Sequence, residues 1–351
     1  MAFGIRGLRR TFTNIITNDM AIDLGTASTL IYIEGQGVVL KQPSVISYRV
    51  SDRSIVAVGD EAKEMYGRTP SGLESVKPMK DGVVSDFALV EEMLRYFMHL
   101  QQKRGLMGHP RVLVSVPTGI TAVESRAVKD SVERAGAREV YLVYEPLAAA
   151  IGVDIDVLSP SANMVIDIGG GTTEIAVIAL AGIVANGSAR IGGDEMDEYI
   201  QRWMKNVYHL DIGVNTAENI KKNVGSAFVL DEEKYMEVRG MEIDSGIPKS
   251  IKIGSSEVRE ALKEPVKMIV QAVKDTLRKT KAELSNDIVD KGIVMTGGGS
   301  LLNGLSDLIQ EETNIRVTVA ENAEESVVRG AGKILANLEI YEKVIMKGEE
   351  E

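Results

Sequence analysis

The same short pattern occurs twice in this chain. Residues 20–29 read MAIDLGTAST and residues 164–173 read MVIDIGGGTT, so that Asp23 and Asp167 hold equivalent positions 144 residues apart. In each copy an apolar strand leads into an aspartate, a turn rich in Gly and Thr, and a second apolar strand, which predicts a β-hairpin. Because the spacing is that of a domain, we expect two related lobes that each present one hairpin tip.

Both hairpin tips contain the residue types that bind phosphate. Glycine lets backbone N–H groups approach phosphate oxygens, successive N–H groups form an anion-binding concavity, and hydroxyl side chains add donors. Mg²⁺ keeps several waters and needs only one or two carboxylates beside a polyphosphate, so Asp23 and Asp167 are suited to organise this ion. Either motif alone could be an ordinary hairpin turn. Together they predict a clamp whose two lobes grip the phosphates of one nucleotide.

Composition sets the class of protein. The 351 residues leave room for about two domains, and 44% hydrophobic and 26% charged residues are usual for a soluble globular protein. No stretch reaches the ~20 consecutive apolar residues of a membrane-spanning helix. The absence of cysteine excludes disulfides and thiolate metal sites, and the three histidines show no metal-binding spacing. A net charge of −11 argues against sequence-independent binding to nucleic acid.

Apolar periodicity and turn residues predict the rest of the first lobe. Residues 37–82 contain short apolar runs broken by prolines, which indicates a small inserted subdomain. Residues 87–102 have apolar side chains on about one face of a helix. The elements expected after this helix are a buried strand at 111–117, a helix at 121–135, a strand at 140–144 and a small-residue helix at 147–152.

Glu145 stands where the last of these strands ends and the helix begins. In open α/β sheets such a position points into the crevice at the carboxyl ends of the strands. A carboxylate there could position water for attack on a γ-phosphate. The alternative is a glutamate favoured in the first helical turn by the helix dipole.

The second lobe repeats this order of elements. A strand at 292–296 enters a turn of three glycines and a serine, and a helix is expected at 301–312. A strand, a Gly turn and a helix N-terminus predict a further phosphate or nucleotide contact. Residues 191–253 are polar and helix-rich, which indicates a second inserted subdomain.

The first seventeen residues predict a basic amphipathic segment. On a helical wheel the large apolar side chains fall within about one 100° sector. These side chains are Ile5, Leu8, Phe12, Ile15 and Ile16. Arg6 and Arg10 lie on the other side, so the segment is suited to lie in the interface of an anionic membrane. The alternative is a helix docked on the protein's own core, and Gly4 and Gly7 weaken the helix in either case.

A second apolar feature occurs in a predicted loop. Leu106 and Met107 are large apolar residues flanked by Gly105 and Gly108. A loop tip normally faces water. The pair therefore indicates a second membrane-facing point.

Taken together, these motifs resemble the superfamily of actin, sugar kinases and heat-shock chaperone ATPases, and most closely the MreB family of bacterial actins. The similar segments occur in the family's order over nearly the whole length. They are AIDLGTAST, KPMKDGVVSDF, VSVPTGITAVESRA, YEPLAAAIG, DIGGGTTE, RIGGDEMDE, TAENIKKNVG and GIVMTGGGSLL. The ordered set is far more specific than any single segment. In this family the loop that matches Leu106 and Met107 is thought to enter the membrane.

The resemblance implies an α/β actin-like fold of two related lobes, each with a central mixed sheet flanked by helices and a small inserted subdomain. Lobe I would be residues 18–153, with its insertion at about 38–84. Lobe II would be residues 154–335, with its insertion at about 191–253. Residues 1–17 would be the membrane-binding segment, and residues 336–351 a C-terminal helix and charged tail that pack back on lobe I.

The resemblance also implies roles for single residues. Asp23 and Asp167 would hold Mg²⁺ largely through water, and Glu145 would orient the attacking water with the help of Thr172. The phosphate loops would be Gly25, Thr26, Ala27 and Ser28 in lobe I, and Gly169, Gly170, Gly171, Thr172 and Thr173 in lobe II. The ribose and adenine contacts would be Glu218, Lys221 and Lys222, and the adenosine-side loop would be Gly297, Gly298, Gly299, Ser300 and Leu301.

Three points qualify this transfer of roles. Glu218, Lys221 and Lys222 also fit i,i+3 and i,i+4 ion pairs on a solvated helix. Ser28 stands where the family usually has Asn, and Tyr144 where it usually has an acidic residue. Both keep a polar group, so we expect nucleotide binding to be retained and the rate of hydrolysis to be affected first.

The function implied is that of an ATP-dependent bacterial actin with Mg²⁺ as its ion. It would be a weak ATPase that polymerises into filaments of paired protofilaments and directs cell shape by organising cell-wall synthesis. Its partners would be other copies of itself, the anionic inner-membrane surface and membrane proteins of the cell-wall elongation machinery, and its location the cytoplasmic face of the cell membrane. The enzyme alternative is a small-molecule kinase of the same superfamily, but the sequence offers no insert for a polyol or acid pocket. A chaperone ATPase would need an appended peptide-binding domain.

Overall fold

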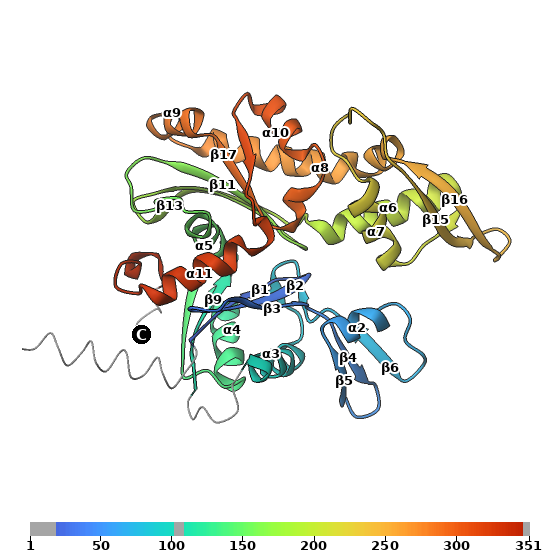
Figure 1. The fold of residues 1–351 in the computed structure, drawn as a ribbon, viewed down its shortest axis with the longest axis horizontal. Helices are drawn as coiled ribbons and strands as arrows, with labels where there is room; N and C mark the ends of the chain where they lie inside the picture. Colours follow the sequence, from blue (N-terminus) through green and yellow to red (C-terminus); the bar gives the residue numbers. More distant parts are fainter. Residues whose placement is uncertain (1–18, 102–108, 347–351) are drawn as a thin grey trace, which may run out of the picture. The chain divides into compact units, whose positions relative to one another are not determined.

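The computed structural model describes residues 19–101 and 109–346. These residues form two compact units, shown in Figure 1. Unit 1 contains the described residues up to Asp156 and those from Glu325 onward, and unit 2 contains Val157–Glu324. The second boundary falls before the expected position at residue 335, because helix α11 (Ser326–Ala336) packs on helix α5 (Glu145–Gly152) of unit 1.

A five-stranded mixed sheet forms the centre of unit 1. Its strand order is β10-β9-β1-β2-β3. The strands are β10 (Glu139–Tyr144), β9 (Arg111–Val116), β1 (Met20–Leu24), β2 (Ser28–Ile33) and β3 (Gly37–Pro43). Strand β1 pairs antiparallel with β2, which confirms the first predicted hairpin, and parallel with β9. The apolar side chains of these strands are nearly all buried, as the uninterrupted apolar runs predicted.

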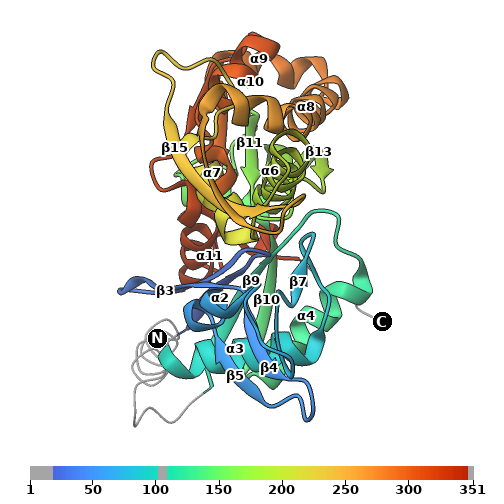
Figure 2. The ribbon, with the colours of Figure 1, turned by 90° about the vertical axis from the view of Figure 1, so that its right-hand side faces the viewer.

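Helices cover both faces of this sheet, as the views in Figure 1 and Figure 2 show. Helices α3 (Phe87–Gln101) and α4 (Ala122–Arg134) lie on one face, and α5 and α11 lie on the other. Helix α4 begins with a capping box, in which the Thr121 hydroxyl accepts from the backbone N–H of Glu124 and the Glu124 carboxylate accepts from that of Thr121. These helices fall close to their predicted ranges.

Two glycines let α5 and α11 cross with their backbones in contact. A Cβ added to Gly330 would lie 1.7 Å from the carbonyl oxygen of Ala148, and one added to Gly152 would lie 1.8 Å from that of Ser326. Only glycine permits this approach. The helix that begins with Glu145 is therefore fixed against α11 along its length.

The insertion of unit 1 is a small sheet of order β5-β4-β6 with one helix. Its elements are β4 (Ile46–Arg49), β5 (Ile55–Val58), α2 (Asp60–Met65) and β6 (Leu73–Val76), followed by the short hairpin β7 (Met79–Lys80) and β8 (Val83–Val84). Its own small core contains Val45, Ala57 and Ala62.

Unit 2 has the same architecture. Its sheet, read from the β18 end, has the order β18-β17-β11-β12-β13, and β11 pairs antiparallel with β12 and parallel with β17. The strands are β11 (Asn163–Ile168), β12 (Thr173–Ala179), β13 (Gly182–Ala189), β17 (Ile293–Thr296) and β18 (Val317–Val319). Helices α8 (Ser255–Lys279), α9 (Ala282–Lys291) and α10 (Leu305–Thr313) pack around it. The second predicted hairpin is thus confirmed, and the two units share one strand order.

The insertion of unit 2 contains more than the predicted helices. It has α6 (Gly193–Tyr208) and α7 (Val214–Val224), and also a three-stranded sheet of order β14-β15-β16. The strands are β14 (Leu210–Asp211), β15 (Tyr235–Glu242) and β16 (Pro248–Gly254).

Two predicted elements differ in the structure. The helix expected at 301–312 is α10, which begins at Leu305, because Gly298–Leu301 form the 3-10 helix η1 and Gly304 has a left-handed φ of 72°. After Ala336 the described chain has a 3-10 turn, η3 (Glu342–Val344), where a C-terminal helix was expected. Ile345 then pairs with Val143 of β10, so this segment does lie on unit 1.

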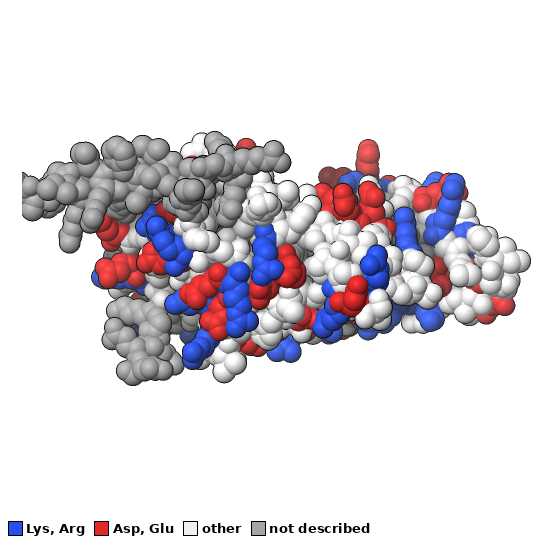
Figure 3. Space-filling view, turned by 90° about the horizontal axis from the view of Figure 1, so that it is seen from below, with Lys and Arg blue, Asp and Glu red and all other residues white. Residues whose placement is uncertain are grey.

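The predicted membrane-contacting residues, Ile5, Leu8, Phe12, Ile15, Ile16, Leu106 and Met107, lie outside the described residues. Within the described ranges, no helix has the length and apolar composition needed to cross a membrane. On the face in Figure 3, acidic and basic side chains are interleaved. Within α3 of unit 1, Arg95 and Glu92 form an ion pair at 2.5 Å.

Candidate functional site

The first candidate phosphate loop joins β1 to β2. The Gly25 N–H donates to the Ser28 carbonyl at 3.2 Å and closes the turn. Ser44 is buried behind the loop: its hydroxyl donates to the Gly25 carbonyl at 2.7 Å and its N–H donates to the Ala27 carbonyl at 3.0 Å. In a trans peptide the N–H points opposite to the carbonyl. The N–H groups of Thr26 and Ser28 therefore point away from Ser44, which is the arrangement that an anion-binding loop requires.

Thr26 connects this loop to the insertion of unit 1. Its hydroxyl accepts from the Gly82 N–H at 3.1 Å, and its side chain is buried. Gly82 lies in the turn between β7 and β8. The predicted phosphate-binding residue is thus also a structural link between the loop and the insertion.

Asp23 and Asp167 are held in the same way in the two units. Asp23 is level with Ser115 of the parallel strand β9, and the Ser115 hydroxyl donates to Asp23 Oδ1 at 3.0 Å. Asp167 is level with Thr296 of the parallel strand β17, and the Thr296 hydroxyl donates to Asp167 Oδ1 at 2.7 Å. Sequence reasoning missed Ser115 and Thr296. The only sequence signal was a hydroxyl residue near the end of each apolar strand.

The two carboxylates differ in burial. Asp23 is half-buried, whereas Asp167 is buried beneath the second loop. Burial raises the pKa of Asp167 to about 6; the Thr296 hydrogen bond lowers this pKa and the nearby Glu174 charge raises it. A cation beside Asp167 would favour its ionised form.

The donor set fits the expected ion. In the described part of the chain, no three His, Cys, Asp or Glu side chains converge to hold a metal. Mg²⁺ keeps several waters and needs only one or two carboxylates beside a polyphosphate, so Asp23 in unit 1 and Asp167 in unit 2 each fit this ion within their own unit.

Glu145 lies at the same sheet edge as Asp23. Strands β1, β9 and β10 run parallel, with Asp23 level with Ser115 and Ser115 level with Val143. Glu145 follows two residues later, as the first residue of α5, and is half-buried. Unit 1 therefore brings the predicted catalytic acid, the predicted metal ligand and the first phosphate loop to one edge of its sheet.

The second candidate phosphate loop is anchored to the N-terminus of α6. The Gly169 N–H donates to the Thr172 carbonyl at 2.8 Å. The Gly169 carbonyl accepts from the Gly193 N–H at 3.0 Å, and the Gly170 carbonyl accepts from the Asp194 N–H at 2.8 Å. The N–H groups of Gly170 and Gly171 therefore point away from α6, so this loop also presents consecutive donors.

The two threonines of this loop differ. Thr173 is fully buried and its hydroxyl donates to the Ile191 carbonyl at 2.7 Å, which is a structural hydrogen bond. Thr172 is half-buried at the tip. Thr172 is thus the better placed of the two to contact a phosphate.

The structure separates the three predicted residues of α7. Lys222 pairs with Glu218 at 2.7 Å on the outer side of the helix, as in the i,i+4 alternative. Lys221 is largely buried, and its ammonium contacts Asp197 Oδ1 at 2.9 Å and the Gly193 carbonyl at 2.5 Å. Asp197 was not among the predicted site residues.

The Gly297–Leu301 loop packs directly on the base of the second phosphate loop. Gly297 has a φ of 80°, and a Cβ there would lie 2.3 Å from the carbonyl oxygen of Ile168, the residue before Gly169. The Ser300 hydroxyl donates to the Gly297 carbonyl at 2.6 Å, and Leu301 is exposed. Beyond it, the Asn303 side chain donates to the Gly225 carbonyl at the end of α7 at 3.1 Å. Unit 2 therefore gathers its predicted residues around one loop.

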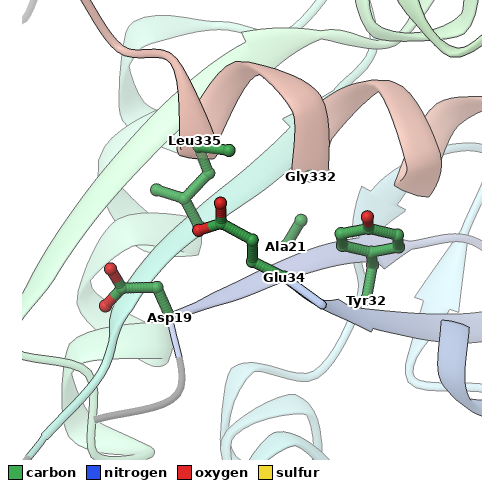
Figure 4. A pocket seen from close by; sticks show the side chains of 7 residues that line it. Asp19, Ala21, Tyr32, Glu34, Gly332 and Leu335 are labelled. Carbon is green, nitrogen blue, oxygen red and sulfur yellow. The ribbon is translucent and has the colours of Figure 1, made fainter. Parts of the chain in front are cut away.

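A separate small cavity of unit 1 contains none of the predicted residues. It lies between β1, β2 and α11, as Figure 4 shows, and is lined by Asp19, Ala21, Tyr32, Glu34, Gly332, Leu335 and Ala336. Asp19 is paired there with Arg111, whose Nε donates to Asp19 Oδ2 at 2.9 Å. Asp19 precedes β1 and Asp23 lies near its other end, so the cavity and the candidate site occupy opposite ends of the strand.

The two units share one strand order, and each has an aspartate and a Gly/Thr turn at the end of its central strand. This arrangement defines a protein of the actin-like class. The model of the MreB/Mbl protein family matches residues 17–343. This chain belongs to the MreB/Mbl family.

Relatives and solved structures agree with this assignment. The chain is 48% identical over 337 residues to the cell shape-determining protein MreB of Escherichia coli strain K12, covering 95% of this chain and 97% of the relative. It is 45% identical to the cell shape-determining protein Mbl of Bacillus subtilis strain 168, covering 93% and 98%. The crystal structure of MreB5 of Spiroplasma citri bound to AMPPNP matches with a TM-score of 0.87 and 32% identity, covering 92% and 96%. The predicted fold class and family are thereby confirmed.

Proposed function

We propose that this chain is a bacterial actin that binds ATP and Mg²⁺, polymerises into filaments on the inner face of the cell membrane and contributes to cell shape. One observation carries the nucleotide part of the proposal. In both units an aspartate near the end of the central strand accepts a hydrogen bond from a hydroxyl of the neighbouring parallel strand. The loop that follows has its carbonyls hydrogen-bonded to the rest of the unit, so its N–H groups are left to face a ligand. Family membership and the AMPPNP-bound relative support the same ligand class.

In the proposed site, the loop N–H groups of both units bind the phosphates. The bound Mg²⁺ would neutralise phosphate charge when present. Glu145 accepts a hydrogen bond from a water and orients it toward the γ-phosphorus. The new P–O bond forms from this water, the bond to the bridging oxygen of ADP breaks, and the proton lost by the water passes to an oxygen of the released phosphate. Thr172 supplies a hydroxyl beside the same phosphate.

In this proposal, slow hydrolysis controls how long a subunit stays in the filament. A nucleotide shifts a conformational equilibrium only through better contacts with one of the states, so ATP would favour the polymerising form and loss of the γ-phosphate would weaken it. Head-to-tail contacts that do not close on themselves produce open filaments. The names of the Escherichia coli and Bacillus subtilis relatives support a role in cell shape.

The membrane part of the proposal depends on residues 1–17 and on Leu106 and Met107. Apolar side chains on one side and arginines on the other favour the interface of an anionic bilayer. Membrane proteins of the cell-wall elongation machinery are the expected partners of a filament held at this surface.

The test is co-sedimentation with anionic liposomes in the presence of ATP and Mg²⁺, followed by negative-stain electron microscopy. The full chain is compared with a chain that lacks residues 2–17 and with the full chain on neutral liposomes as the charge control. We expect filaments on the anionic liposomes and a weaker coating after the truncation. Soluble monomers under every condition would contradict the cytoskeletal role, and transfer of phosphate to a small acceptor would favour the kinase alternative.

A further inference from the structure

A buried ion pair connects α7 to the N-terminus of α6 in unit 2. The Asp197 side chain is 5% exposed and that of Lys221 is 13% exposed, and Lys221 Nζ lies 2.9 Å from Asp197 Oδ1. Burying two charges is costly unless they are paired and also satisfied by further hydrogen bonds. The lysine side meets this condition, because its ammonium also donates to the Gly193 carbonyl at 2.5 Å. Asp197 Oδ1 has no hydrogen bond of good geometry among the described residues, so its charge is compensated by the ion contact with Lys221.

This ion pair leads directly to the second phosphate loop. Gly193 accepts from Lys221 through its carbonyl, and its N–H donates to the Gly169 carbonyl at 3.0 Å. The next N–H, that of Asp194, donates to the Gly170 carbonyl at 2.8 Å. These two bonds determine which way the loop N–H groups point. An unbroken chain of contacts thus runs from the Asp197 carboxylate to the donors that would face phosphate.

The packing leaves little freedom for an alternative arrangement. A Cβ on Gly192 would lie 2.4 Å from the Gly170 carbonyl oxygen and 2.7 Å from that of Gly169. A Cβ on Gly193 would lie 3.1 Å from Lys221 Nζ. The start of α6 is therefore held between the loop and the lysine, so a shift of Lys221 is passed on to the loop.

We propose that Asp197 is a positioning residue for phosphate binding, which holds Lys221 in place so that the start of α6 keeps the Gly169–Thr172 loop in its donor-presenting form. This inference rests on the proposed binding of ATP. It assigns Lys221 to the support of the phosphate loop through Gly193, in addition to any contact that its side chain makes with a nucleoside. Burial raises the pKa of Asp197 to about 6, and the Lys221 charge opposes this effect, as expected for a carboxylate whose ionisation depends on its partner.

The direction of the change in ATP affinity distinguishes a positioning role of Asp197 from a purely electrostatic effect of its charge. Removing a negative charge near a polyphosphate should strengthen ATP binding by electrostatics alone. If Asp197 instead positions the loop, Asp197→Asn should weaken ATP binding, and adenosine, which has no phosphate, should bind as before. We expect ATP binding to be roughly tenfold weaker, which is the size of one hydrogen bond to a charged group.

The experiment measures ATP and adenosine binding by calorimetry in the full chain, at concentrations where no polymer sediments. The matched control is Asp19→Asn, which removes a charge from the Asp19–Arg111 pair of unit 1, with side chains 8% and 18% exposed. The control should lose stability, while its ATP affinity should stay within about twofold of the wild type, since Asp19 lies at the opposite end of β1 from the first phosphate loop.

A second variant covers the case in which Asp197→Asn does not fold. Asp197→Asn combined with Lys221→Met removes both charges together and leaves no unpaired buried ion. Because Lys221 is also a predicted nucleoside contact, adenosine binding can weaken in this variant, but the loss of ATP affinity should exceed the loss of adenosine affinity.

Three outcomes would be decisive. Unchanged or tighter ATP binding in Asp197→Asn, or in the double variant, would overturn the positioning role and leave the proposed function intact. An equal loss of ATP and adenosine binding would also overturn it. A wild-type chain that does not bind ATP would overturn the proposed function, and this inference with it.

Discussion

Asp167 lies where a carboxylate is difficult to ionise. The side chain is buried, and its pKa rises from the ordinary value of 3.8 to about 6. Below pH 4 the carboxyl is neutral in folded and unfolded chains alike. Between about pH 4 and pH 6 the unfolded chain has lost the proton and the folded chain has kept it, so the free energy of unfolding falls as pH rises through this range.

Asp167→Asn should therefore stabilise the nucleotide-free protein at neutral pH. The amide can still accept from Thr296 and carries no charge, so we expect a gain of about 2–3 kcal/mol at pH 7 that shrinks toward zero near pH 4. Urea unfolding of both proteins across this range measures the difference. A difference that does not change with pH would show that the carboxylate is not destabilised by burial. The same substitution should weaken Mg²⁺-dependent ATP binding.

Glu145→Ala should separate binding from hydrolysis. Glu145 is the first residue of α5, whereas the hydrogen bonds described above that tie back the two loops come from Ser44, Gly193 and Asp194, so ATP affinity should change little. Loss of the group that orients water should slow phosphate release by about 100-fold. Calorimetry with ATP and a phosphate-release assay give the two quantities, and a loss of ATP binding in this variant would contradict the assigned role.

At the residue scale, the sequence predicts the two Gly/Thr hairpin turns but not the residues that support them. The Gly/Thr tips are contiguous motifs, whereas Ser44, Ser115 and Thr296 reach them through tertiary structure. The pairing of β1 with β9 joins strands some 90 residues apart, which no local pattern encodes. The burial of Lys221 could have been predicted from the sequence. The buried stripe of α7 contains Ala217, Ile220 and Val224, and Lys221 lies on this stripe, four residues after Ala217.

Among the elements, the α5–α11 crossing is the most tightly constrained contact described above. Gly330→Ala would place a methyl group against the Ala148 carbonyl, and backbone cannot move aside as a side chain can. We expect a loss of about 3 kcal/mol of unfolding free energy.

The matched control is Gly119→Ala, also in unit 1, where a Cβ meets nothing within 4 Å. It should change stability by no more than about 0.5 kcal/mol. Urea unfolding of the two variants beside the wild type provides the measurement. Equal stabilities would mean that the two helices can separate without cost.

Elements were predictable where they bury a continuous apolar face. The β14–β16 sheet was not predicted because β15 buries only Val238 and β16 only Ile253 and Gly254, too few for a clear alternation. Helix α10 starts late because Gly304 takes a left-handed conformation after the 3-10 turn η1. A Cβ on Gly304 would also lie 2.6 Å from the Cβ of Phe228, a close packing with a residue distant in sequence that no local pattern shows.

For the whole molecule, the shared strand order predicts matched behaviour of the two units. Ser115→Ala and Thr296→Val each remove the hydroxyl that donates to the local aspartate. Each should weaken Mg²⁺-dependent ATP binding by a similar factor of roughly 3 to 10, since one hydrogen bond is lost in each case. Mg²⁺ titrations of ATP binding test this, and an effect confined to one unit would show that only one aspartate contributes.

The matched sheets also differ at one informative place. In unit 1, Val143 of β10 is level with Ser115 of β9. In unit 2, Val319 of β18 is level with Met295 of β17, so the next residue, Ala320, lies beside Thr296. Two residues further on, unit 1 has Glu145 and unit 2 has Asn322. This chain thus has an acid at this place in one unit and a neutral amide, shorter by one methylene group, in the other. Only unit 1 therefore offers a carboxylate at this place, so the shared strand order alone does not make the two units equivalent for the hydrolysis proposed above.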